Sequence, residues 1–232
     1  MTSRSDPRHG LSSASKVEQD SLCKGAFLAQ QGIPSRGSAD ATKGTERHEL
    51  EEREVPLEDI VDDEDRECSR RARASLEYVR EKLNIPDSST ISRELRFWLK
   101  DGDEELLSGQ VDYVETWDKT ALIADYKMLY GIHASAHNNV QLAAYAALLK
   151  HEWKEIETVY AALIEPFGEP RLSTVVFTSG ELEKKISELI KLYRVVYCGI
   201  AERTAGHRQC KFCRALGICP EARTYVMELI NE

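Results

Sequence analysis

The sequence contains no apolar run long enough to cross a membrane, and its N-terminal segment, MTSRSDPRHG, lacks the apolar core of a signal peptide. It contains no internal repeat, which excludes a solenoid or a propeller. Basic residues are also in deficit, because 31 Lys and Arg stand against 40 Asp and Glu and give a formal net charge of −9. We therefore expect a cytoplasmic protein without a membrane partner, in which any basic surface is local.

The 232 residues are enough for one sizeable core, and 41% hydrophobic with 31% charged residues is typical of a globular protein. Residues 1–11 have no periodic apolar positions, so we expect a disordered tail followed by a single domain over 12–232. Acidic residues crowd the segment 46–67, which is typical of a solvated helix face. Basic residues recur in two groups that could line a substrate groove or face solvent: Arg66, Arg70, Arg71, Arg73 and Arg80, and Arg203, His207, Arg208, Lys211 and Arg214.

Periodicity predicts an α/β chain. A short helix is expected over 11–23, a loop rich in Gly, Ser and Pro over 32–44, and then a helix with Thr45 as its N-cap. The later elements are a helix over 65–83, strands over 90–99, 106–115 and 121–128, a helix over 138–151, strands over 156–164 and 172–177, and helices over 179–203 and 220–230. Three strands thus precede one helix, and two strands follow it.

Two of the predicted strands each carry one carboxylate in an apolar run, Asp112 in one and Asp125 in the next. Residues i and i+2 of a strand share a face, so Lys127 points the same way as Asp125 and Tyr126 points the other way. If the two strands pair, two carboxylates and an ammonium group meet at one place. Carboxylates that close repel each other unless a divalent cation lies between them, and the lysine could then hold a phosphate or an attacking water.

An Asp-x-Lys pair alone is also common on the solvent face of a hairpin. Here, however, Gly-x-x-Asp112 and Asp125-x-Lys127 precede a helix with Gln141 and Tyr145 on one face. This combination resembles the PD-(D/E)xK nuclease superfamily, specifically its RecB-like branch with phage and CRISPR-associated iron–sulfur exonucleases. The resemblance implies a restriction-endonuclease-like core, in which a mixed β-sheet is flanked by helices in the order αβββαββα.

The segment Gly-Thr-x-x-His48 precedes the three strands, although a single histidine in a helix is more often a surface or core residue. In the resembled branch this histidine joins the metal site. The resemblance thus implies that His48, Asp112 and Asp125, with the main-chain carbonyl of Tyr126, hold Mg²⁺ or Mn²⁺, and the imidazole favours Mn²⁺. Glu94, on the strand before Asp112, could join these ligands or pair with an arginine.

Near the C-terminus, the segment CKFCRALGICP places three thiolates around one centre, so a fourth ligand must come from elsewhere. The three are Cys210, Cys213 and Cys219. In a cytoplasmic chain such cysteines favour metal ligation over disulfides, and the spacing fits structural Zn²⁺ equally well. The resemblance favours a 4Fe-4S cluster with Cys23 as the fourth ligand, which would staple the two chain ends together. Cys68 is the alternative fourth ligand, and Cys198 is expected to be a buried free thiol.

The function that the resemblance implies is divalent-metal-dependent hydrolysis of phosphodiester bonds in DNA, with exonuclease action on single-stranded ends preferred. Lys127 would orient the attacking water, and Gln141 and Tyr145 would contact the DNA. The partners would be DNA and replication, recombination or adaptation proteins. Two other functions stay open: a DNA-end-binding iron–sulfur protein with weak or no cleavage, and a zinc-stapled structural component of a phage assembly. Neither needs Asp112, Asp125 and Lys127 together.

Overall fold

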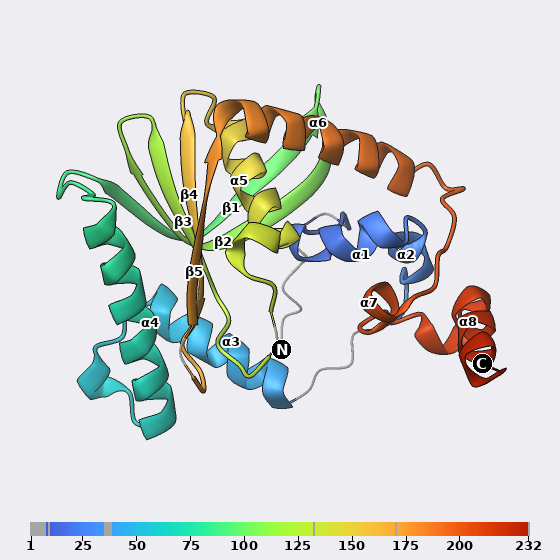
Figure 1. The fold of residues 1–232 in the computed structure, drawn as a ribbon, viewed down its shortest axis with the longest axis horizontal. Coiled ribbons are helices and arrows are strands. Elements are labelled where there is room, and N and C mark those ends of the chain that lie inside the picture. Colours follow the sequence, from blue (N-terminus) through green and yellow to red (C-terminus); the bar gives the residue numbers. More distant parts are fainter. Residues whose placement is uncertain (1–7, 9, 35–38, 132, 170, 232) are drawn as a thin grey trace.

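A five-stranded mixed sheet organises the computed structural model of the chain (Figure 1). Its strands, which lie side by side in this order, are β1 (Thr90–Asp101), β2 (Glu104–Trp117), β3 (Thr120–Tyr126), β4 (Thr158–Glu165) and β5 (Arg171–Thr178). Strands β1, β2 and β3 form an antiparallel meander, β4 runs parallel to β3, and β5 is antiparallel to β4. The parallel step requires a crossover, and helix α5 (Val140–Glu152) makes it.

The structure describes residues 8, 10–34, 39–131, 133–169 and 171–231. The other helices are α1 (Val17–Leu22), α2 (Ala26–Ala29), α3 (Ala39–Glu52), α4 (Asp63–Lys82), α6 (Ser179–Val196), α7 (His207–Cys210) and α8 (Pro220–Asn231). None of the described helices is both long enough and apolar enough to cross a membrane. Most of the predicted tail, residues 1–7 and 9, lies outside the described residues.

The two faces of the sheet bury alternate residues of the same strand. On β3, Ala121 and Ile123 belong to the core under α5 and α6, whereas Leu122, Ala124 and Tyr126 belong to the core under α4. This is the period of two that a strand requires when both of its faces are covered. Odd-numbered residues of β3 therefore face α5, and even-numbered residues face α4.

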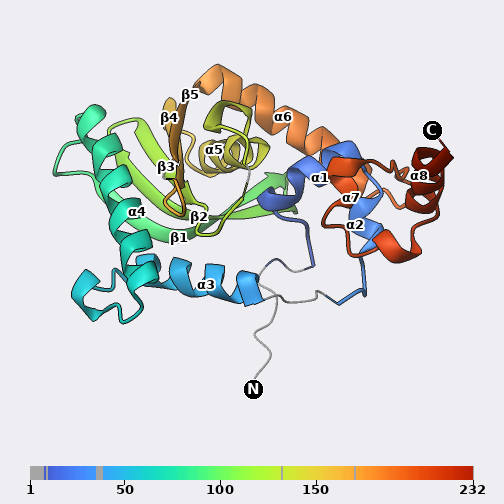
Figure 2. The same ribbon diagram turned by 60° about the horizontal axis from the view of Figure 1, so that its bottom comes forward.

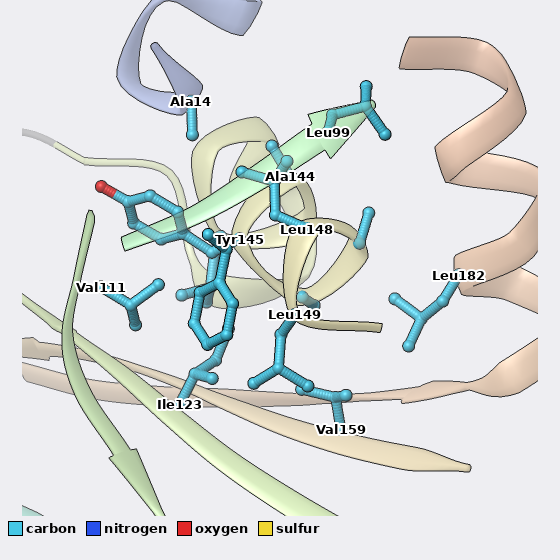
Figure 3. Packing of buried hydrophobic residues seen from close by; sticks show 14 of the residues in the cluster. Ala14, Leu99, Val111, Ile123, Ala144, Tyr145, Leu148, Leu149, Val159 and Leu182 are labelled. Atoms are coloured by element: carbon cyan, nitrogen blue, oxygen red, sulfur yellow. The ribbon is translucent and has the colours of Figure 1, made fainter. Parts of the chain in front are cut away.

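Helix α5 is apolar on almost all sides because it lies between the sheet and α6. Figure 3 shows this core, with Ala144, Tyr145, Leu148 and Leu149 of α5 packed against Val111, Ile123 and Val159 of the sheet and Leu182 of α6. Gly109 of β2 permits the close approach, because a Cβ atom there would lie 2.8 Å from side-chain atoms of Tyr145 and Leu148. The glycine of the Gly-x-x-Asp segment thus has a packing role.

The predicted start of α3 was wrong. The helix begins at Ala39, so Thr45 lies inside it and is not its N-cap, and the expected loop over 32–44 is shorter. Gly44 lies within the helix, where a glycine costs about 1 kcal/mol relative to alanine but does not end a helix that tertiary contacts hold.

The predicted end of α6 was also wrong, because the helix ends at Val196 and not near Arg203. Gly199 follows with φ 83°, a left-handed conformation that commonly ends helices. Cys198 therefore lies in the turn beyond the helix and is exposed, which corrects the expectation of a buried thiol.

The segments near the two ends of the chain lie side by side, with α1 and α2 next to α7 in both Figure 1 and Figure 2. The main-chain nitrogen of Gly25 donates to the carbonyl of Glu202 at 2.8 Å. The side chain of Gln19 donates to the carbonyl of Gln209 at 2.7 Å. These individual hydrogen bonds, and no strand pairing among the described residues, join segments that are more than 150 residues apart in the sequence.

Candidate metal centre

Asp112 and Asp125 face each other where β2 and β3 separate. The last pair in the register of these strands is Tyr113 with Ala124, so Asp112 and Asp125 are the next positions. In place of further strand pairing, the main-chain nitrogen of Tyr126 donates to Asp112 Oδ2 at 2.7 Å. Asp125 continues the row of Ala121 and Ile123 and lies on the α5 side of the sheet, where it is 4% exposed. As the sequence predicted, this face is opposite to that of Leu122, Ala124 and Tyr126.

Glu94 of β1 lies beside Asp112 of β2, on the side of β2 away from β3. Leu95 pairs with Val111, which places Glu94 opposite Asp112. Glu94 has φ 50°, a left-handed conformation that costs a residue with a Cβ atom about 1–2 kcal/mol. On β2, Val111 and Val114 both face the α5 core although they are three positions apart, so the alternation is interrupted at this place. Both strands are thus irregular where their carboxylates meet.

His48 of α3 completes a group with Glu94 and Asp112. One ligand atom of each lies within 4.8 Å of the other two, and His48 Nδ1 is 3.5 Å from Asp112 Oδ2. Burial lowers the pKa of His48, which favours the neutral imidazole that binds metals. Burial raises the pKa of Asp112 well above its usual value, and the charge of Asp125 adds to this; burial also raises the pKa of Glu94. The positive charges of Lys127 near Asp112 and of Arg96 near Glu94 do not outweigh this burial.

Lys127 and Gln141 both contact the carboxylate of Asp125. Lys127 Nζ lies 2.6 Å from Asp125 Oδ2. Gln141 donates to Asp125 Oδ1 and accepts from Lys127 Nζ, both at 3.2 Å, and it donates to the hydroxyl of Tyr145 at 2.8 Å. The ring of Tyr145 is part of the core and only 5% exposed, so in this structure Tyr145 positions Gln141 and does not face the open site.

The donor set fits a hard divalent cation. Asp125 Oδ2 is buried and, within the described part of the chain, receives no well-directed hydrogen bond, although the ammonium of Lys127 is close. The ammonium offsets the charge of this buried oxygen, and the oxygen keeps a lone pair that could bind a metal. Carboxylates with one imidazole suit Mg²⁺ or Mn²⁺. A cavity of about 320 Å³ lies beside this place and is lined by His48, Tyr126 and Lys127 among others.

Arg47 holds α3, and so His48, against the site. Its guanidinium is buried and donates to Asp65 Oδ1 at 2.7 Å, to Glu64 Oε2 at 2.7 Å and to the carbonyl of Met128 at 2.9 Å. One side chain thereby connects α3, α4 and the residue that follows Lys127. The sequence analysis missed this role, because a single arginine in an acidic segment does not indicate which carboxylates it will meet.

We expect Arg47→Ala to lower the free energy of unfolding by about 3 kcal/mol, because it removes a buried partner of Asp65 and leaves the Met128 carbonyl without its donor. Urea unfolding followed by circular dichroism measures this loss. The matched control is Arg53→Ala, directly after the end of the same helix, whose exposed ion pair with Glu49 should contribute less than about 1 kcal/mol. Equal effects of the two substitutions would contradict the anchoring role of Arg47.

Four cysteines from the two ends of the chain line one cavity: Cys23, Cys210, Cys213 and Cys219. Among the described residues, no three of their sulfur atoms lie within 4.8 Å of one another. A tetrahedral zinc site needs sulfur atoms about 3.8 Å apart, from a Zn–S bond of about 2.3 Å. The spacing is therefore wider than zinc requires. Cys68 lies elsewhere, in the core under α4 and 3.8 Å from the sulfur of Met128.

The two predicted basic groups differ in their surroundings. The first lies on α4 and pairs with carboxylates: Arg66 with Asp63, Arg70 and Arg71 with Glu67, Arg73 with Glu51, and Arg80 with Glu115. Its charge is thus largely compensated. From the second group, His207, Arg208 and Lys211 line a cavity that also includes Lys127. The partners of the first group lie on α4 itself, on α3 and on β2, and the second group lies near the candidate metal centre.

The sequence matches one family model over residues 9–232, and the description of that family is "Protein of unknown function (DUF2800)". No curated protein matches the chain. A solved structure of a candidate exonuclease from Eubacterium rectale is similar to it, with a TM-score of 0.53 and 10% identity over 99% of this chain and 97% of the other. At this identity the likeness shows the fold alone, which is therefore nuclease-like. A second structure, SSO0001, has a TM-score of 0.37 at 13% identity, over 89% of this chain and 96% of its own, and carries no argument.

Proposed function

The chain belongs to the DUF2800 family of proteins of unknown function, and we propose that it is a divalent-metal-dependent deoxyribonuclease of the RecB-like branch of the PD-(D/E)xK superfamily. The observation that carries the proposal is the meeting of Asp112, Asp125 and Lys127 where β2 and β3 separate, with His48 and Glu94 against them. A nuclease-like fold around this place supports the same reaction. Neither a purely structural protein nor a simple DNA-binding module needs this combination of charged groups.

In the proposed reaction, His48, Glu94 and Asp112 would hold the cation, Asp125 would supply a further carboxylate, and the Tyr126 carbonyl would be an additional ligand. When bound, the cation would polarise the phosphate and lower the pKa of a bound water, whose hydroxide form attacks the phosphorus. Lys127, whose side chain is 20% exposed, lines the cavity at His48. There it orients the attacking water and offsets the charge that develops on the phosphate oxygens.

Gln141 and Tyr145 have positioning roles in this proposal. Gln141 fixes the orientation of both Lys127 and Asp125, and it also lines the cavity that extends toward α7. Gln141 is therefore the member of the pair that can touch DNA, whereas Tyr145 acts through it. The substrate that we propose is the end of a DNA strand, with single-stranded ends preferred.

We also propose that Cys23, Cys210, Cys213 and Cys219 hold a 4Fe-4S cluster that staples the two ends of the chain. The wide separation of the sulfur atoms supports a cluster over Zn²⁺. Burial raises the pKa of the Cys23 and Cys213 thiols, so their ligating thiolate form needs positive charge nearby. The role is structural, because the staple joins α1 and α2 to the segment that carries α7.

The proposed reaction is tested by incubating anaerobically purified protein with end-labelled single-stranded and double-stranded DNA. We expect cleavage with Mn²⁺ or Mg²⁺ and none in EDTA, and Mn²⁺ should support the faster reaction because one ligand is an imidazole. Denaturing gel electrophoresis of the labelled strand measures the products. Cleavage that persists in EDTA would contradict the metal-dependent mechanism. Binding of DNA ends without cleavage under any cation would favour the DNA-end-binding function instead.

A further inference from the structure

A groove extends from the candidate metal centre toward α7. Its volume is about 510 Å³, and Lys127 and His133 line both this groove and the cavity at His48. The two spaces therefore meet at Lys127. The distant wall of the groove comes from the C-terminal segment and includes Arg208 of α7, Lys211 and Phe212. Figures 1 and 2 both show α7 next to α1 at this end of the molecule.

The groove is cationic in a chain whose formal net charge is −9. The lining includes one carboxylate, Glu18, and this group is already paired with Arg208. Lys211 has no carboxylate within ion-pair distance among the described residues. On the opposite wall the groove meets Asn139 at the start of α5, where helix amides carry partial positive charge. Polyanions are the ligands that such a lining attracts.

An exposed aromatic ring lies within this cationic lining. Phe212 is 73% exposed, and Lys211 Nζ lies 5.0 Å from the centre of its ring. The turn that carries both residues is fixed, because Cys213 N donates to the Cys210 carbonyl at 3.1 Å. An aromatic face beside a free ammonium is the pair that binds single-stranded nucleic acid, since a base stacks on the ring and its phosphate meets the cation.

We propose that this groove binds a single strand of nucleic acid, with one base stacked on Phe212 and the adjacent backbone phosphate at Lys211. The strand would then lead along the groove to Lys127. This step to the reacting bond rests on the proposed nuclease function, whereas binding in the groove does not. A duplex cannot bind in this way, because its bases already stack on one another. Phe212 would thus select single-stranded ends.

The test measures binding in EDTA, so that no cleavage occurs. The probes are a fluorescent oligothymidylate of about ten residues and an abasic strand with the same number of phosphates. The full-length protein should bind the oligothymidylate roughly 5- to 150-fold more tightly, which is the contribution of one to a few kcal/mol from base stacking. Phe212→Ala should abolish this preference, and Phe212→Trp should keep it. Lys211→Ala should weaken both probes alike and lower the salt dependence by about 0.7 in log K per log unit.

The matched control is Tyr78→Ala on α4. Tyr78 is also an exposed aromatic residue, with Lys82 Nζ 5.3 Å from its ring centre, but it does not line the groove. Thermal melts confirm that each variant is folded. A folded Phe212→Ala protein with the wild-type preference, a wild-type protein that does not distinguish the probes, or an equal loss in Tyr78→Ala would overturn the proposal. If the protein binds both probes as expected but cleaves no DNA under any cation, the proposed nuclease function is wrong and the proposed binding site in the groove still holds.

Discussion

Asp125→Asn and Lys127→Met should each lower the rate of DNA cleavage by at least about 10²- to 10³-fold, the loss that follows removal of one group that stabilises charge in a transition state. The reason is that both groups act on the same phosphate, and Lys127 Nζ is 2.6 Å from Asp125 Oδ2. The double variant should be little worse than either single one, because parts of one catalytic unit are not additive. Single-turnover cleavage of end-labelled DNA in Mn²⁺ measures all three rates.

The matched control is Lys119→Ala, at the other end of β3. Lys119 forms an exposed ion pair with Glu157, far along the strand from the candidate metal centre, and its loss should leave the cleavage rate unchanged. Asp125→Asn should leave the metal-free protein folded, because the relieved repulsion on the buried Asp112 carboxyl offsets the lost ion pair with Lys127. Wild-type cleavage by the Lys127→Met protein would refute the proposed mechanism.

Cys23→Ser should remove the 4Fe-4S cluster and lower the melting temperature by roughly 8–16 °C. A hydroxyl is a poor ligand for this soft site. In the wild-type protein the cluster closes a loop so long that it should stabilise the fold by on the order of 4 kcal/mol. In a chain of this size each kcal/mol changes the melting temperature by about 2–4 °C. Anaerobically purified wild-type protein should be brown and contain iron and sulfide, and the variant should be colourless. Absorbance spectra, metal analysis and thermal melts provide the measurements.

The controls are the two cysteines outside the cavity. Cys198→Ser should keep the colour because Cys198 is exposed beyond the end of α6. Cys68→Ser should also keep it, because Cys68 lies in the core under α4, where burial raises the pKa of its thiol to about 11 and disfavours the ligating thiolate. A colourless wild-type protein with stoichiometric zinc would rule out the cluster, and a brown Cys23→Ser protein would show that another residue is the fourth ligand.

The sequence by itself predicted the features that depend on local periodicity. Three strands, a helix and two further strands follow from alternating and helical patterns, and the structure has these elements. The common face of Asp125 and Lys127 needs only the period of two of a strand. Their meeting with Asp112 needs only that neighbouring strands form a hairpin. The errors lay where a few tertiary contacts decide: at the ends of elements, such as Ala39 and Val196, at the exposed Cys198, and in the short helices α2 and α7, which were not predicted.

The tertiary structure alone decided the features that join distant segments. The left-handed conformation of Glu94 is unfavourable locally, and it persists because packing on both faces of the sheet determines it. The partners of Arg47 lie 17, 18 and 81 residues away, and no pattern near Arg47 indicates them. Likewise, Phe212 is an ordinary loop residue in the sequence. It becomes part of a groove with Lys127 only because the folded chain packs α7 against α1, and α1 against α5.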